Sequence, residues 1–83
     1  MNLGRLSEHS VSLSLSDLYL RYRFVPSIID IQAAVPTGTT DRIMQNFPVS
    51  RYVARCVLAA LSTHLGQHFN LSNVIVNLTD VEQ

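Results

Sequence analysis

Apolar and polar residues alternate along the first third of the chain. From Ser10 to Ser16 the apolar residues occupy the odd positions, and from Leu18 to Phe24 they occupy the even positions. Because successive side chains of a strand point to opposite faces, a period of two predicts a half-buried strand. The pattern therefore predicts a first strand over residues 10–24.

The change of register near Ser16 and Asp17 needs a structural cause. A β-bulge would keep one continuous strand with both apolar sets on the core face, whereas a tight turn would split it into two. We favour the bulge. A helix is the alternative, with Ser16 as its cap and Leu18, Tyr22 and Val25 on one side, but the long alternation and the Val, Tyr and Phe content favour a strand.

A second apolar stretch covers residues 27–35, between Pro26 and Pro36. Its polar residues Asp30 and Gln32 alternate with apolar neighbours. This stretch is long enough to pair with the first strand, and the pattern predicts a second strand.

Residues 36–40 have the composition of a loop, and Thr40 could cap a short helix whose first residue is Asp41. Its apolar side would comprise Ile43, Met44 and Phe47. Pro48 would end or kink this helix.

The most strongly periodic segment runs from Pro48 or Ser50 to about Leu65 and predicts an amphipathic core helix. At 100° per residue one broad face collects Val53, Ala54, Val57, Leu58, Leu61 and Leu65, and the opposite face collects Arg51, Arg55 and Ser62. Gly66 would end the helix in the left-handed conformation.

The last element predicted is a strand over residues 74–79, after a turn at residues 70–73. Val74, Val76 and Leu78 would face the core, and Ile75 would lie on the polar face. The predicted fold is a small two-layer α+β sandwich of order β-β-(short α)-α-β, with the long helix packed on an antiparallel or mixed sheet. One domain would span residues 10–79, between a flexible tail at 1–9 and a short acidic tail at 80–83.

Charge is scarce in this chain of 83 residues. Only 14% of the residues are charged and 47% are apolar, against roughly 25% charged in ordinary globular proteins. Six arginines balance six acidic residues, so net charge gives no support for attraction to nucleic acid or membranes. The low charge favours a surface that is partly covered by a partner.

Cys56 is the only cysteine, so no internal disulfide can form. No signal peptide is recognisable, and no apolar stretch approaches the roughly 20 residues of a membrane span. We therefore expect a cytoplasmic protein.

Catalytic and metal-binding patterns are weak. His64 and His68 have the i, i+4 spacing of metal ligands on a helix, but Gly66 lies between them and no third ligand is evident. No nucleophile elbow or phosphate-binding glycine motif is present. We expect no enzymatic activity, cofactor, metal or small-molecule substrate.

Arginine and tyrosine mark the candidate contact surfaces. Tyr19, Arg21 and Arg23 would alternate along the outer face of the first strand, where they could stack on bases and hold phosphates. Arg51 and Arg55 form a second basic pair. With the helix packed on the inner sheet face, however, the two arginine pairs would lie on different layers, so nucleic-acid binding is the alternative and not the leading hypothesis.

Protein association is the leading hypothesis. The low charge, the long apolar first strand and the outward Ile75 all favour a covered surface. The predicted partner-binding residues are Tyr19, Arg21, Arg23, Arg51, Tyr52 and Arg55, which are of types common at interface hot spots. We expect a non-catalytic module that binds another protein or copies of itself, such as an adaptor, an inhibitor or a regulatory subunit, of the kind common among accessory proteins of phages and mobile elements.

Overall fold

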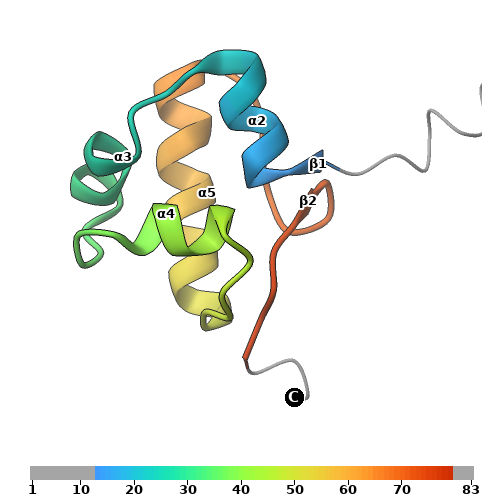
Figure 1. The fold of residues 1–83 in the computed structure, drawn as a ribbon. Helices are drawn as coiled ribbons and strands as arrows, with labels where there is room; N and C mark the ends of the chain where they lie inside the picture. Colours follow the sequence, from blue (N-terminus) through green and yellow to red (C-terminus); the bar gives the residue numbers. More distant parts are fainter. Residues whose placement is uncertain (1–12, 80–83) are drawn as a thin grey trace, which may run out of the picture.

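The structure, a computed structural model, describes residues 13–79, and the tails predicted at residues 1–9 and 80–83 lie outside this range. In chain order the elements are β1 (Leu13–Ser14), α2 (Leu15–Tyr22), α3 (Pro26–Ala33), α4 (Thr39–Met44), α5 (Arg51–Leu65) and β2 (Val74–Ile75). Helix α5 runs through the middle of the molecule, with α2 and α3 on its two sides and α4 across it (Figure 1). The mixed helix-and-strand class is confirmed, but the order of elements is β-α-α-α-α-β.

The strand predicted over residues 10–24 is wrong for residues 15–22, which form α2. Ser14 and Asp17 make a capping box: Ser14 Oγ accepts the N–H of Asp17 at 3.2 Å, and Asp17 Oδ2 accepts the N–H of Ser14 at 3.1 Å. The residues that face the core follow helical spacing: Leu15 and Leu18 are buried, and Tyr19 and Tyr22 are half-buried. The register change therefore marks a helix start and not a bulge, and the cap is Ser14 instead of Ser16.

Residues 26–33 form α3, so the second predicted strand is also wrong. Pro26 occupies the first turn, where its fixed φ favours a helix and its missing N–H costs nothing. Ala34 ends the helix with a φ of 60°. The polar and apolar residues of this stretch do not separate onto two faces as in a strand, because Asp30 is only 2% exposed and Ile31 is 76% exposed.

Asp30 is buried because its carboxylate caps the next helix. Its Oδ2 accepts the N–H of Gly38 at 2.8 Å, and its Oδ1 accepts the N–H of Thr40 at 2.8 Å and the Thr40 hydroxyl at 2.6 Å. These donors lie at the N-terminus of α4, where negative charge is favourable. A side chain of α3 thereby fixes the position of α4.

Helix α4 begins two residues earlier than predicted and also ends early. Gly38, with a φ of 94°, is the N-cap in place of Thr40. The helix stops at Met44 before Pro48 is reached, and Asn46 has a φ of 69°. Phe47 consequently lies outside the helix and is exposed, whereas Ile43 faces the core as predicted.

The prediction for α5 is confirmed. Ser50 caps its start by accepting the N–H of Val53 at 3.2 Å, and Gly66 ends it with a φ of 69°. Its buried residues are Ala54, Val57, Leu58, Ala60 and Leu61.

The sheet differs from the predicted one. Strands β1 and β2 have two residues each and pair in parallel, with Leu13 opposite Val74. The strand predicted over residues 74–79 is therefore short, although Val49 and Leu78 make a further parallel bridge. Within it the predicted facing is confirmed at Val74, which is buried, and at Ile75, which is exposed.

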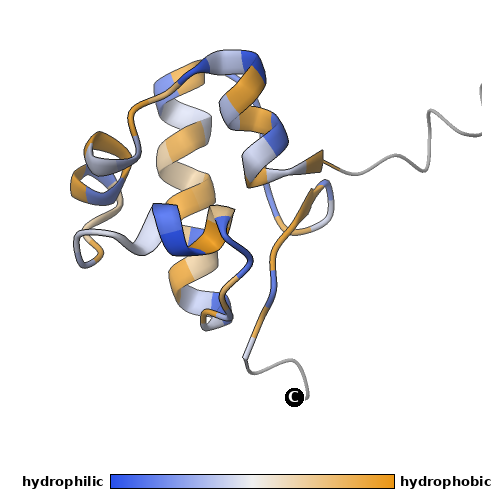
Figure 2. Cartoon of the chain, viewed as in Figure 1, coloured by the Kyte–Doolittle hydropathy of each residue, from blue (hydrophilic) through white to orange (hydrophobic). Residues whose placement is uncertain are grey.

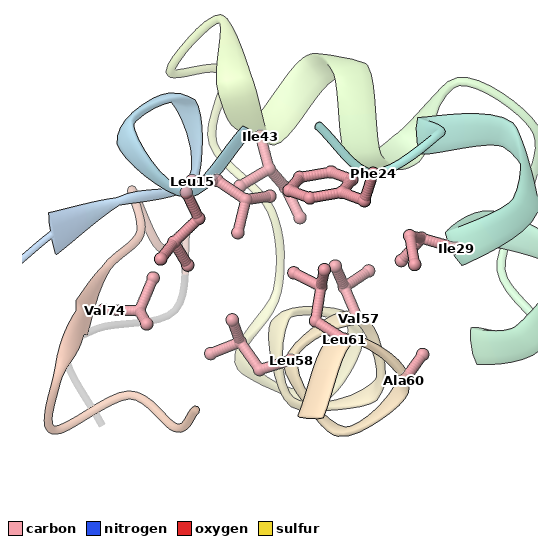
Figure 3. Packing of buried hydrophobic residues seen from close by; sticks show 10 residues of the cluster. Leu15, Phe24, Ile29, Ile43, Val57, Leu58, Ala60, Leu61 and Val74 are labelled. Atoms are coloured by element: carbon pink, nitrogen blue, oxygen red, sulfur yellow. The ribbon is translucent and has the colours of Figure 1, made fainter. Parts of the chain in front are cut away.

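The core lies mainly between helices and not between a helix and a sheet. It comprises Leu15, Leu18, Phe24, Ile29, Ile43, Val57, Leu58, Ala60, Leu61 and Val74. In Figure 3, side chains of Val57, Leu58 and Leu61 point from α5 toward those of the surrounding elements. The most extensive helix contact in the described residues is between α3 and α5.

The Asp30 cap can be tested by replacing Asp30 with asparagine. The asparagine side chain has one oxygen and one NH₂ group, so one of the two backbone N–H groups of Gly38 and Thr40 would face a donor instead of an acceptor. We therefore expect a loss of about 1–3 kcal/mol in the free energy of unfolding, measured with urea. Asp41→Asn is the control, because it removes the same charge from the first turn of α4 at an exposed position. Equal losses in the two variants would mean that only charge matters.

Burial of α5 can be tested with Leu61→Ala. Leu61 is fully buried, so we expect a loss of about 2–5 kcal/mol in the free energy of unfolding. Leu20→Ala removes the same atoms from an exposed side chain of α2 and should change stability by less than about 0.5 kcal/mol. A small effect at Leu61 would contradict the packing of α5.

Candidate functional site

The six predicted contact residues fall on two helices. Tyr19, Arg21 and Arg23 belong to α2 and its end, and Arg51, Tyr52 and Arg55 belong to the first turns of α5. The C-terminal end of α2 lies beside the C-terminal end of α5, where Tyr22 meets Phe69 with ring centroids 6.1 Å apart (Figure 1). The three predicted residues of α2 therefore lie toward the C-terminal end of α5, whereas the three predicted residues of α5 lie at its N-terminal end.

Within α2, the three predicted residues do not share one face. Two residues along a helix are turned by about 200°, so Tyr19 and Arg21 point to different sides. Tyr19 is half-buried and packs edge-on against Phe24 at 5.5 Å. Arg23 places its guanidinium group 5.9 Å from the centre of the Tyr19 ring. The continuous Tyr and Arg face predicted for a strand is thus not formed.

On α5 the predicted residues do come together. Arg51 and Arg55 are one helical turn apart, and Tyr52 is 74% exposed beside them. Both arginines border a groove between α5 and residues 69–72, with a volume of about 400 Å³. We call it the Arg groove, and its lining includes Arg51, Arg55, Leu58, Ala59, Phe69 and Leu71.

The outer wall of the Arg groove is held by polar side chains. The Ser62 hydroxyl donates to Leu58 O at 2.8 Å and accepts the N–H of Phe69 at 2.9 Å. Asn73 Oδ1 accepts the N–H of Asn70 at 2.9 Å, which closes the turn that the sequence predicts at residues 70–73. Ser62, assigned to the outer face of the helix, is therefore a structural link between α5 and this wall.

Among the described residues, those that line the Arg groove and carry a charge are both arginines. Five of the six arginines lie in residues 13–79, together with three aspartates, of which Asp30 is buried. Among the described residues that line the Arg groove there is no acidic one. Its charged lining residues are two arginines, and the rest of its lining combines apolar residues with the polar Asn70 and Ser72.

Sequence reasoning found the arginines but missed the apolar side of the groove. Leu58 could be assigned only to the core, and Phe69 and Leu71 lie in a segment without periodicity. The turn signal at residues 70–73 shows that the chain reverses there, but not that it returns along α5.

The two histidines do not share a helix face. His64 is in the last turn of α5, and His68 lies beyond Gly66 in non-helical backbone. In the part of the chain that the structure describes, no group of three or more His, Cys, Asp or Glu residues could hold a metal ion.

Comparisons with protein-family models, curated proteins and solved structures found no match. Within residues 13–79, none of the helices combines the length and apolar character required to cross a membrane.

The wall of the groove can be tested with Ser62→Ala. Removal of the hydroxyl leaves the N–H of Phe69 without its acceptor, so we expect faster hydrogen exchange at this amide. Alanine retains a high helix propensity, so α5 should stay formed. Thr63→Ala, at an exposed neighbouring position, is the control, and an equal change in both variants would contradict the role of Ser62.

Proposed function

We propose that the protein is a non-catalytic protein-binding module. Its Arg groove binds a segment of a partner protein that carries an acidic side chain next to an apolar one. The observation that supports this proposal is that two arginines and several apolar residues line one groove. Such a module would act as an adaptor, an inhibitor or a regulatory subunit, by bridging proteins or covering a surface.

The chemistry of the groove favours this ligand. A guanidinium group can bind a carboxylate through two parallel hydrogen bonds. The half-buried side chains of Phe69 and Leu71 line the same groove and offer an apolar contact beside the arginines. The exposed ring of Tyr52 adds a residue type that is common at the centre of protein interfaces.

A nucleic-acid ligand fits less well. Phosphate recognition usually relies on a broad basic surface, and single-strand recognition on exposed aromatic faces. The Arg groove offers two arginines, and the exposed Tyr52 lies on the same helix but outside the lining of the groove, in a chain with no net charge. Tyr19, which could have added a second stacking face, packs against Phe24.

The proposal can be tested by selecting binders from a displayed library of random twelve-residue peptides. We expect enrichment of peptides with Glu or Asp beside Leu or Phe. Against a synthesised selected peptide, Arg55→Glu should raise the dissociation constant more than about tenfold, because it places like charges together. Arg42→Glu is the matched control, since Arg42 is exposed on α4 and does not line the groove.

Three results would contradict the proposal. They are a library that yields no binder, selected peptides that bind Arg55→Glu as well as the unmodified protein, or selected peptides without acidic residues. If the protein instead binds a 20-nucleotide single strand with affinity that falls steeply with salt, the nucleic-acid alternative replaces it.

A further inference from the structure

The described chain ends beside the start of α5, at the end of the Arg groove that Arg51 lines. Val49, two residues before this helix, accepts the N–H of Thr79 at 2.9 Å and pairs in parallel with Leu78. The N–H of Val49 donates to Asn77 O at 2.9 Å. In Figure 1 the last described residues accordingly reach the end of the molecule at which α5 begins. The residue that follows Thr79 in the sequence is therefore attached close to the first turn of α5.

The position of Thr79 is fixed by packing as well as by hydrogen bonds. Figure 2 shows hydrophobic residues in the segment between β2 and the end of the described chain. Val76 of this segment packs against the core, and Leu78 is half-buried. The side-chain amide of Asn77 donates to Asn46 O at 3.0 Å. A segment that continues from Thr79 consequently starts from a fixed point.

The sequence that follows Thr79 has the chemistry that the Arg groove favours. It reads Asp80, Val81, Glu82 and Gln83, so two acidic residues flank an apolar one. Two of the six acidic residues of the chain lie in this short stretch, and it contains no basic residue. Among the described residues that line the Arg groove, two are arginines and none is acidic. The stretch and the groove are therefore complementary in charge.

We propose that residues 80–83, the acidic tail, bind in the Arg groove of their own chain and compete there with the partner segment. The carboxylate of Asp80 pairs with Arg51. The carboxylate of Glu82 pairs with Arg55, in the charge-assisted contact that guanidinium groups favour. This inference rests on the proposed function, because the tail uses the same groove and the same ligand chemistry.

The spacing of the charges fits this contact. Alternate residues of an extended chain lie on one side, about 7 Å apart. Arg51 and Arg55 are about 6 Å apart along the helix axis. Four extended residues span up to about 14 Å, so the tail is long enough to reach both arginines from Thr79. Val81 is then directed to the opposite side, toward the wall formed by residues 69–72.

Direct attachment favours the tail of the same chain over an acidic segment of a second copy. A ligand joined to its site by a short flexible connection has an effective concentration in the millimolar range. A separate chain binds only at its own free concentration. The tail thus acts as an internal inhibitor, and it raises the apparent dissociation constant of a partner segment in proportion to the fraction of molecules whose groove is covered.

The contact can be tested by paramagnetic broadening of NMR signals, with no partner peptide present. The full chain carries Cys56→Ser and Gln83→Cys, and a nitroxide spin label is attached to the introduced thiol. We expect the label to broaden the amide signals of Ala59 and Leu71, which line the Arg groove on its two sides.

The charge dependence of the broadening decides whether the contact is the proposed one. Addition of Asp80→Asn and Glu82→Gln should reduce the broadening more than about twofold, because the charge complementarity is lost. Asp41→Asn is the control, since Asp41 is exposed on α4 and does not line the groove. Equal broadening with and without the two carboxylates would overturn the proposal. So would broadening of unlabelled chains by labelled ones in a mixture, because a second copy would then be the occupant.

The competition can be measured with a peptide selected on the Arg groove. In the variant that combines Asp80→Asn with Glu82→Gln, the dissociation constant should fall more than about threefold, because the groove is open in more of the molecules. Asp41→Asn should leave the dissociation constant unchanged. Equal affinities of the double variant and the unmodified chain would contradict the competition.

The two measurements distinguish this inference from the proposed function. Charge-dependent broadening, together with a library that yields no binder for either chain, would remove the proposed function and support the contact of the tail. A selected peptide that binds, together with broadening that does not depend on Asp80 and Glu82, would remove the inference and leave the proposed function in place.

Discussion

The buried carboxylate of Asp30 is the interaction on which the arrangement of the helices depends. Its oxygens accept hydrogen bonds from Gly38 and Thr40 and so join α3 to the start of α4. Helix α4 is too short to be stable alone, because nucleating a helix costs more than a single turn returns. With its N-terminus fixed by α3, α4 can place Ile43 in the core.

The sequence predicts the central helix well and the short elements poorly. The period of 3.6 persists over the fifteen residues of α5, and Ser50 and Gly66 mark its ends. Helices α2 and α3 have eight residues each, a length over which alternation and helical spacing are hard to distinguish. The capping box at Ser14 and Asp17 was the local signal for a helix, whereas the burial of Asp30 depends on donors eight and ten residues away.

The candidate site, too, could be predicted only in part from the sequence. Arg51, Tyr52 and Arg55 could be identified because they recur on one helix near its start. The opposite wall of the Arg groove depends on the contact between Ser62 and Phe69, which no periodicity reveals. Tyr19 was wrongly placed on an outer face because a strand and a helix direct alternate residues differently. One side of α5 contributes buried residues to the core, and another side carries the candidate contact residues Arg51, Tyr52 and Arg55.

The parallel pairing of β1 and β2 has a consequence for how the chain folds during synthesis. Leu13 lies opposite Val74, so two ends of the described fold must meet before this small sheet exists. A chain emerging from the ribosome can form α5 locally, but Leu15 lacks the neighbouring Val74 of the core until residue 74 has been translated. The strands therefore pair only after all four helices of the described residues have been synthesised, and a partner that acts on the nascent chain would meet the helices first.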